Sequence, residues 1–169
     1  AGAGMAYCGT WYNQQVILVC SGIGKKLANW ALEEICNRFT VSEIISIGFA
    51  GGLEPGLETG DLVIPDSVRE CRNETVKLSS DSLLFLDDHL LGEALDLSFS
   101  DKLIVKSGGL VTVDSPARSR DEKQKLYERY SAIAVDMETF SLLRFALLKE
   151  IPFLSVRSIS DSANQELID

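Results

Sequence analysis

The fold of this chain is most readily inferred from residues 134–161, which read AVDMETFSLLRFALLKEIPFLSVRSISD. The apolar run at residues 132–135 predicts a short strand, and Asp136 follows it at the position of a helix N-cap. Residues 137–149 are apolar nearly all round, which is typical of a helix packed on several sides. Residues 153–159 predict the next strand, so this stretch indicates an α/β fold.

The same alternation of strands and helices continues toward the N-terminus. Residues 16–20 predict a strand buried on both faces, residues 25–39 a helix, and residues 43–47 a strand parallel to the first one through a right-handed crossover. The other elements are expected as strands at residues 60–65 and 102–106, the latter followed by a surface loop from Ser107, and as helices at residues 83–97 and 117–130. We therefore predict a three-layer α/β/α domain with a central, mostly parallel but mixed sheet.

Composition excludes several classes of function. The 169 residues are 46% hydrophobic and 24% charged, which fits one globular domain. Sixteen Lys and Arg against 25 Asp and Glu give a net charge of −9, so neither nucleic acid nor an anionic membrane is an expected partner. Apolar runs are far shorter than the roughly 20 residues that cross a bilayer.

The cysteines favour a reducing compartment over a metal site. The four cysteines form no Cys-x-x-Cys pair, and the sequence has one histidine, His89. We expect buried, reduced thiols in a cytoplasmic protein, with no metal. The glycine segment at residues 22–26 lacks the first glycine and closing Ser/Thr of a Walker loop and the third glycine of a dinucleotide fingerprint. No cofactor is therefore expected.

Two acidic residues are candidates for chemistry at the ends of predicted elements. Glu138 lies in the first turn of an apolar helix, where a stabilising helix-dipole charge is the common alternative. Asp161 ends the last strand, where an N-cap is the common alternative. Arg157 lies on that strand among apolar residues and needs a partner, for which Glu138 and Asp161 are the candidates.

Three stretches resemble one known family. They are VILVCSGIGKKLA (16–28), IISIGFAGGLEPGLETGDLVI (44–64) and AVDMETFSLLRFALLKEIPFLSVRSISDSA (134–163). Together they resemble the purine nucleoside phosphorylase and methylthioadenosine/S-adenosylhomocysteine nucleosidase superfamily. Within it, GLVTVDSPARSRDEKQKL (109–126) looks closer to the nucleosidase-like branch that includes the hopanoid-associated adenosyl nucleosidases.

The resemblance implies cleavage of the N-glycosidic bond of a purine nucleoside and assigns roles to nine residues. Glu138 would clasp the ribose hydroxyls, and Asp161 would hold or protonate the leaving purine at its N7 side. The other positions it implies for substrate binding are Met137 under the sugar, Ala50 and Gly51 beside the anomeric carbon, Val111 and Thr112 behind the base, and Arg157 and Ser160 in support of Asp161.

Two departures from the family pattern favour hydrolysis. Ser46 stands where the phosphorylases carry a phosphate-binding arginine, and Phe49 replaces a small hydroxyl residue. We expect hydrolysis of a 5′-substituted adenosine to adenine and the ribose product. The alternatives are a phosphorolytic enzyme and a non-catalytic protein that binds or stores nucleosides.

The ends of the sequence also differ from the pattern. The resemblance implies a first strand, with a water-activating glutamate, before residues 9–19 and a long helix after Asp161. Residues 5–169 are therefore expected to be a single, incomplete domain, and residues 1–4 an expression scar. A homo-oligomer, most simply a dimer, is the expected assembly.

Overall fold

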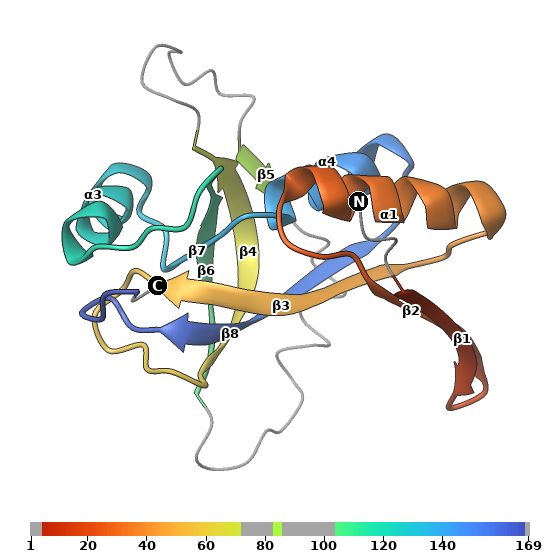
Figure 1. Ribbon diagram of the computed structural model, residues 1–169, viewed down its shortest axis with the longest axis horizontal. Helices are drawn as coiled ribbons and strands as arrows, with labels where there is room; N and C mark the ends of the chain where they lie inside the picture. The colour runs from red at the N-terminus through yellow and green to blue at the C-terminus, as the bar shows by residue number, and fades with distance from the viewer. Residues whose placement is uncertain (1–4, 72–82, 86–103, 168–169) are drawn as a thin grey trace.

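The computed structural model describes residues 5–71, 83–85 and 104–167 (Figure 1). Its elements in chain order are β1 (Met5–Trp11), β2 (Gln14–Cys20), α1 (Lys25–Arg38), β3 (Ile44–Gly52), β4 (Leu62–Glu70), β5 (Leu83–Phe85), β6 (Val105–Thr112), α3 (Arg120–Tyr130), β7 (Ala134–Asp136), α4 (Thr139–Leu148) and β8 (Phe153–Asp161).

The central sheet is mixed, as predicted, and it also closes on itself. Its strand order is β5-β4-β6-β7-β3-β8, and β4 pairs with β8 as well. The pairs β3–β8, β4–β6 and β6–β7 are parallel, whereas β3–β7, β4–β5 and β4–β8 are antiparallel. The β4–β8 contact joins Leu62 to Ser158 and Val63 to Arg157. The sequence analysis did not predict this closure.

The helices lie on different sides of the sheet. Helices α1 and α4 contact each other, and α4 packs on β4 and β8. Helix α3 packs against β6, away from α1 and α4 (Figure 1). Buried residues of the strands and of α4, including Val63, Leu110 and Leu143, form the main core. The predicted α/β class is therefore confirmed. No helix of the described residues is long and apolar enough to cross a membrane.

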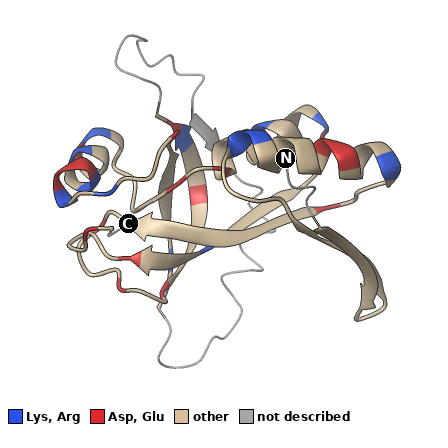
Figure 2. Ribbon diagram, viewed as in Figure 1, with Lys and Arg blue, Asp and Glu red and all other residues tan. Residues whose placement is uncertain are grey.

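Residues 16–20 lie in a strand, β2, as predicted, but the prediction that this strand is buried on both faces was wrong. It forms a separate antiparallel hairpin with β1, in register from Met5 with Cys20 to Trp11 with Gln14. The turn uses Tyr12 and Asn13 at φ 45° and 64°. The expected parallel pairing of β2 with β3 does not form, and Leu18 is 61% exposed. Strands β1, β2 and β3 carry no charged residue (Figure 2).

Three other element boundaries differ from prediction. Strand β4 continues past Pro65, because an irregular register between Pro65 and Ser67 accommodates the proline. Strand β6 runs through Gly108, where we expected a loop. A Cβ at this position would lie 2.8 Å from Ile133, so only glycine lets the strand pass this close to that side chain. Residues 83–85 form a strand instead of the start of a helix, and the rest of that predicted helix lies outside the described residues.

Candidate active site

A buried ion pair lies at the end of strand β7. The Arg157 Nε donates to Asp136 Oδ2 at 3.0 Å, and the two side chains are 3% and 0% exposed. The prediction that Glu138 or Asp161 would pair with Arg157 was therefore wrong. Asp136 is the partner because its carboxylate points into the protein and can remain charged there only beside a cation.

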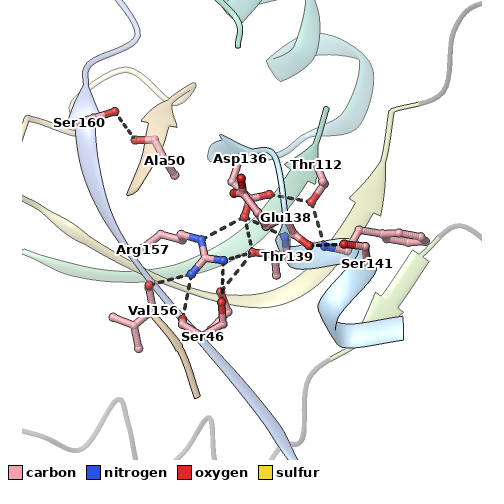
Figure 3. Close-up of polar contacts among 12 residues, drawn as sticks. Ser46, Ala50, Thr112, Asp136, Glu138, Thr139, Ser141, Val156, Arg157 and Ser160 are labelled. Carbon is pink, nitrogen blue, oxygen red and sulfur yellow. Dashed lines mark hydrogen bonds and ion pairs between the residues drawn. The ribbon is translucent and has the colours of Figure 1, made fainter. Parts of the chain in front are cut away.

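All five N–H donors of Arg157 are engaged (Figure 3). Besides the bond from Nε, Nη1 donates to the carbonyl oxygens of Ser46 at 2.9 Å and Val156 at 3.1 Å. Nη2 donates to Ser46 Oγ at 2.9 Å and to Thr139 Oγ1 at 2.7 Å. A guanidinium has five N–H groups, so this one has none left for an anion.

The same network fixes the start of helix α4. Asp136 Oδ2 accepts from the Thr139 backbone N–H at 3.0 Å, and Asp136 Oδ1 accepts from Thr112 Oγ1 at 2.7 Å. Thr112 Oγ1 also accepts from the Phe140 backbone N–H at 3.0 Å. Asp136, expected as an N-cap, thus binds the first turn from the end of β7. Glu138 is the N-cap residue itself and makes no side-chain cap bond.

A cavity of about 460 Å³ brings most of the predicted site residues together. It lies at the carboxyl ends of several strands, where α/β proteins place their ligands. The predicted residues that line it are Ala50, Gly51, Met137, Glu138, Arg157, Ser160 and Asp161. Val111 and Thr112 are instead fully buried in the core, and Val113 lines the cavity.

Glu138 faces the cavity from the start of α4. Its Oε1 accepts from the Gly24 backbone N–H at 2.6 Å, at the N-terminus of α1. In the described part of the chain no cation pairs with this carboxylate. Among the described residues, Glu138 is thus held by a backbone N–H at the N-terminus of a helix and has no cationic side chain as a partner.

Asp161 faces the same cavity from the end of β8. The Ser160 hydroxyl lies 3.2 Å from the Ala50 carbonyl oxygen (Figure 3). It also lies within hydrogen-bond distance of Asp161 Oδ1. The Nζ of Lys123 contacts Asp161 Oδ2. Ser160 therefore supports Asp161 as expected, whereas Arg157 does not. Sequence analysis missed Lys123, although it shares one face of a predicted amphipathic helix with Leu126 and Tyr130.

Gly51 leaves space between the Val135 side chain and the Asp161 carboxylate. A Cβ at this position would lie 3.2 Å from Val135 Cγ1 and 3.3 Å from Asp161 Oδ2. Both distances are shorter than ordinary van der Waals contact, so a side chain here would displace the carboxylate or the strand. Among the described residues no group of three or more His, Cys, Asp or Glu side chains could hold a metal ion.

Comparisons with known proteins identify relatives of the whole chain. A family model described as "Phosphorylase superfamily" matches residues 1–169. A 5′-methylthioadenosine/S-adenosylhomocysteine nucleosidase of Baumannia cicadellinicola is 30% identical over 167 residues, which cover 94% of this chain and 73% of the relative. The Staphylococcus aureus protein of the same name is 28% identical over 169 residues, which cover 95% of this chain and 74% of the relative.

Solved structures share the fold. The 5′-methylthioadenosine/S-adenosylhomocysteine nucleosidase of Neisseria meningitidis, in complex with methylthio-immucillin-A, matches with a TM-score of 0.81 at 25% identity, over 95% of this chain and 74% of that one. Futalosine hydrolase of Helicobacter pylori matches with a TM-score of 0.84 at 23% identity, over 97% of this chain and 74% of that one. The second likeness shows the fold alone.

Proposed function

The chain belongs to the phosphorylase superfamily, and from this premise we propose that it hydrolyses the N-glycosidic bond of a purine nucleoside. The substrate we propose is a 5′-substituted adenosine, and the products are adenine and the 5′-substituted ribose. Relatives named 5′-methylthioadenosine/S-adenosylhomocysteine nucleosidase support this choice of substrate.

The observation that carries the proposal is the shared cavity of Glu138 and Asp161. Departure of the base leaves positive charge on the ribose, and a nearby carboxylate stabilises charge that grows only in the transition state. Glu138 suits this role because no described cation neutralises it. It would also accept hydrogen bonds from the ribose hydroxyls.

Asp161 would act on the leaving base. The C1′–N9 bond breaks with its electron pair passing to the purine, and N7 takes up a proton. The oxygen of water bonds to the positively charged C1′ and releases one proton to solvent. Asp161 would hold or protonate N7, a contribution of about 10²–10⁴-fold for a typical general acid. Met137 would pack under the sugar, and Ala50 and Gly51 would line the space beside C1′.

Hydrolysis is favoured over phosphorolysis by the charges around the cavity. Arg157 is the one cation among the described lining residues, and all its N–H groups are already bonded to protein. Ser46, at the position of the phosphorylases' arginine, accepts from Arg157 and carries no charge. A phosphate dianion would therefore meet carboxylates without a free cation.

We further propose a cytoplasmic homodimer. The described cysteines are all free thiols, which suits a reducing compartment. The prediction of buried thiols was wrong for Cys8 and Cys20, which are exposed. Closed dimers are the commonest assembly of soluble chains. Light scattering coupled to size-exclusion chromatography would measure the mass, and a monomer at micromolar concentration would contradict the dimer.

The test of the reaction is adenine release from 5′-methylthioadenosine or S-adenosylhomocysteine, measured by chromatography with and without phosphate. We expect equal rates in both buffers. A strict requirement for phosphate would assign a phosphorylase instead. Adenine binding by calorimetry without turnover would assign a non-catalytic nucleoside-binding protein.

A further inference from the structure

Lys123 is a buried cation that the proposed reaction does not yet use. It lies on α3, whose other charged residues face solvent, yet its side chain is 0% exposed. Burial of an unpaired ammonium costs several kcal/mol, so a lysine in this place requires strong partners.

The ammonium group has three partners, one for each of its N–H donors. Nζ contacts Asp161 Oδ2, and it donates to the carbonyl oxygens of Ser162 at 2.7 Å and Gln165 at 2.9 Å. The two carbonyls fix where Nζ lies, and Nζ in turn fixes one oxygen of Asp161. Ser160 contacts the other oxygen, so both ends of the carboxylate are held.

Lys123 itself does not line the cavity, whereas Asp161 does. Any effect of Lys123 on a substrate must therefore pass through Asp161. The pair also carries no net charge, and the Asp136–Arg157 pair carries none either. Among the lining carboxylates of the described residues, only Glu138 has no cationic side chain as a partner.

We propose that Lys123 is a positioning residue for departure of the base: by holding one oxygen of the Asp161 carboxyl group, it aims this group into the cavity. This inference rests on the proposed function. Whether Asp161 gives its own proton to N7 or accepts a hydrogen bond from an N7 already protonated by water, its carboxyl oxygen must lie within hydrogen-bond reach of N7. The ammonium holds the carboxyl group in that position.

The test compares two leaving groups in wild type and Lys123→Met. Adenine needs protonation or a hydrogen bond to depart, whereas 4-nitrophenolate leaves a 4-nitrophenyl riboside as a stable anion. We expect Lys123→Met to lower kcat for 5′-methylthioadenosine by about 10²-fold, a typical general-acid contribution. KM should change little, and hydrolysis of the nitrophenyl riboside should remain near wild type.

Lys125→Met is the matched control, because it makes the same substitution on the same helix. Lys125 pairs with Asp121 at the surface, where its side chain is 71% exposed, and it does not line the cavity. We expect this variant to keep the wild-type ratio of the two rates. Equal losses on both substrates in Lys123→Met, or no loss on either, would overturn the inference.

Two further measurements keep the test decisive. If Lys123→Met does not fold, Lys123→Gln keeps two N–H donors without the charge and should give the same selective loss. If turnover is too slow to measure, calorimetry should show that Lys123→Met weakens adenine binding and that Lys125→Met does not, and equal affinities would contradict the inference. A wild type that neither binds nor releases adenine would instead overturn the proposed function.

Discussion

Asp136 and Arg157 show how one buried pair organises the residues around it. The carboxylate binds the guanidinium, the Thr112 hydroxyl and the first turn of α4. Met137 and Glu138 follow Asp136 directly in the chain and line the cavity. The position of Glu138 therefore depends on the Asp136 network beneath it.

Asp136→Ala should destabilise the protein strongly. The change leaves Arg157 buried without its carboxylate, which costs about 3–5 kcal/mol in comparable buried pairs. Urea unfolding followed by circular dichroism measures the loss. Asp121→Ala is the control, because the Asp121–Lys125 pair is 74% and 71% exposed and should contribute about 0.5 kcal/mol or less. Similar losses in both variants would contradict this account.

Gly51→Val should reduce activity more than stability. Its side chain would push against Asp161 and Val135, which lie 3.3 and 3.2 Å from a Cβ at this position. We expect at least a tenfold loss of adenine release, since small displacements of catalytic groups have effects of this size or larger. Gly9→Val is the control, because nothing lies within 4 Å of a Cβ there. Normal turnover by Gly51→Val would show that Asp161 tolerates displacement.

At the residue scale, the sequence predicted which charged side chains are buried better than it predicted which side chains they pair with. Arg157 was recognised as a buried cation that needs a carboxylate, but three acidic residues stand at comparable ends of elements. Spacing along the chain does not determine which of them points inward. The family resemblance placed Thr112 behind the base, and the register of β6 turns this residue into the core.

Helix α3 is built to hold its inner face against β6. The Ser119 side chain accepts from the Glu122 backbone N–H at 3.2 Å, and the Glu122 side chain bonds back to the Ser119 N–H at 3.1 Å, which forms a capping box. Lys123 and Tyr130 are the buried residues of this helix. The helix thus carries Lys123, which contacts Asp161, and Tyr130, which belongs to a second cluster of buried hydrophobic residues, separate from the main core.

The pH dependence of unfolding should report on Tyr130. Burial, and after it the neighbouring Cys71 thiol, raises the pKa of Tyr130 to about 12. An exposed tyrosine in the unfolded chain ionises near pH 10. The folded chain therefore retains a proton that the unfolded chain loses, so stability contributed by Tyr130 is present below about pH 10 and is lost as pH rises toward 12.

Tyr130→Phe separates this effect from general alkaline denaturation. Apart from its interaction with the Cys71 thiol, a weak hydrogen-bonding group, the Tyr130 hydroxyl has no hydrogen-bond partner among the described residues, so the variant should match wild type at about pH 8 within roughly 1 kcal/mol. Between about pH 10 and 11.5 it should lose less stability than wild type, as urea unfolding would measure. Parallel decline of the two proteins would contradict the assignment.

The positions of helices and strands were predicted more accurately than the pairing between strands. The helices at α1, α3 and α4 and the strands β2, β3, β7 and β8 follow from apolar periodicity, which is a local property. The hairpin of β1 with β2 and the continuation of β4 past Pro65 depend on which strand supplies the hydrogen bonds. For β4 that partner is β6, a distant segment, whereas the β1–β2 hairpin is a local feature that the analysis of the sequence did not predict.

Over the whole molecule, the closed sheet determines where the cavity lies. Parallel strands β3 and β8 end side by side, so Ala50 and Gly51 from one strand meet Ser160 and Asp161 from the other. The family resemblance assigned these four residues to one site, and their position agrees with the rule that ligands bind at the carboxyl ends of strands. It did not predict closure through β4 and β8, because that contact joins segments about a hundred residues apart in the chain.

The most direct test of the central claim is the steady-state rate of adenine release from 5′-methylthioadenosine in phosphate-free buffer, for wild type, Glu138→Gln and Asp161→Asn. Both substitutions keep the size of the side chain and remove its charge. We predict release by wild type and a loss of at least about 10²-fold in each variant. Wild-type rates in both variants would contradict the claim that these two carboxylates cleave the nucleoside.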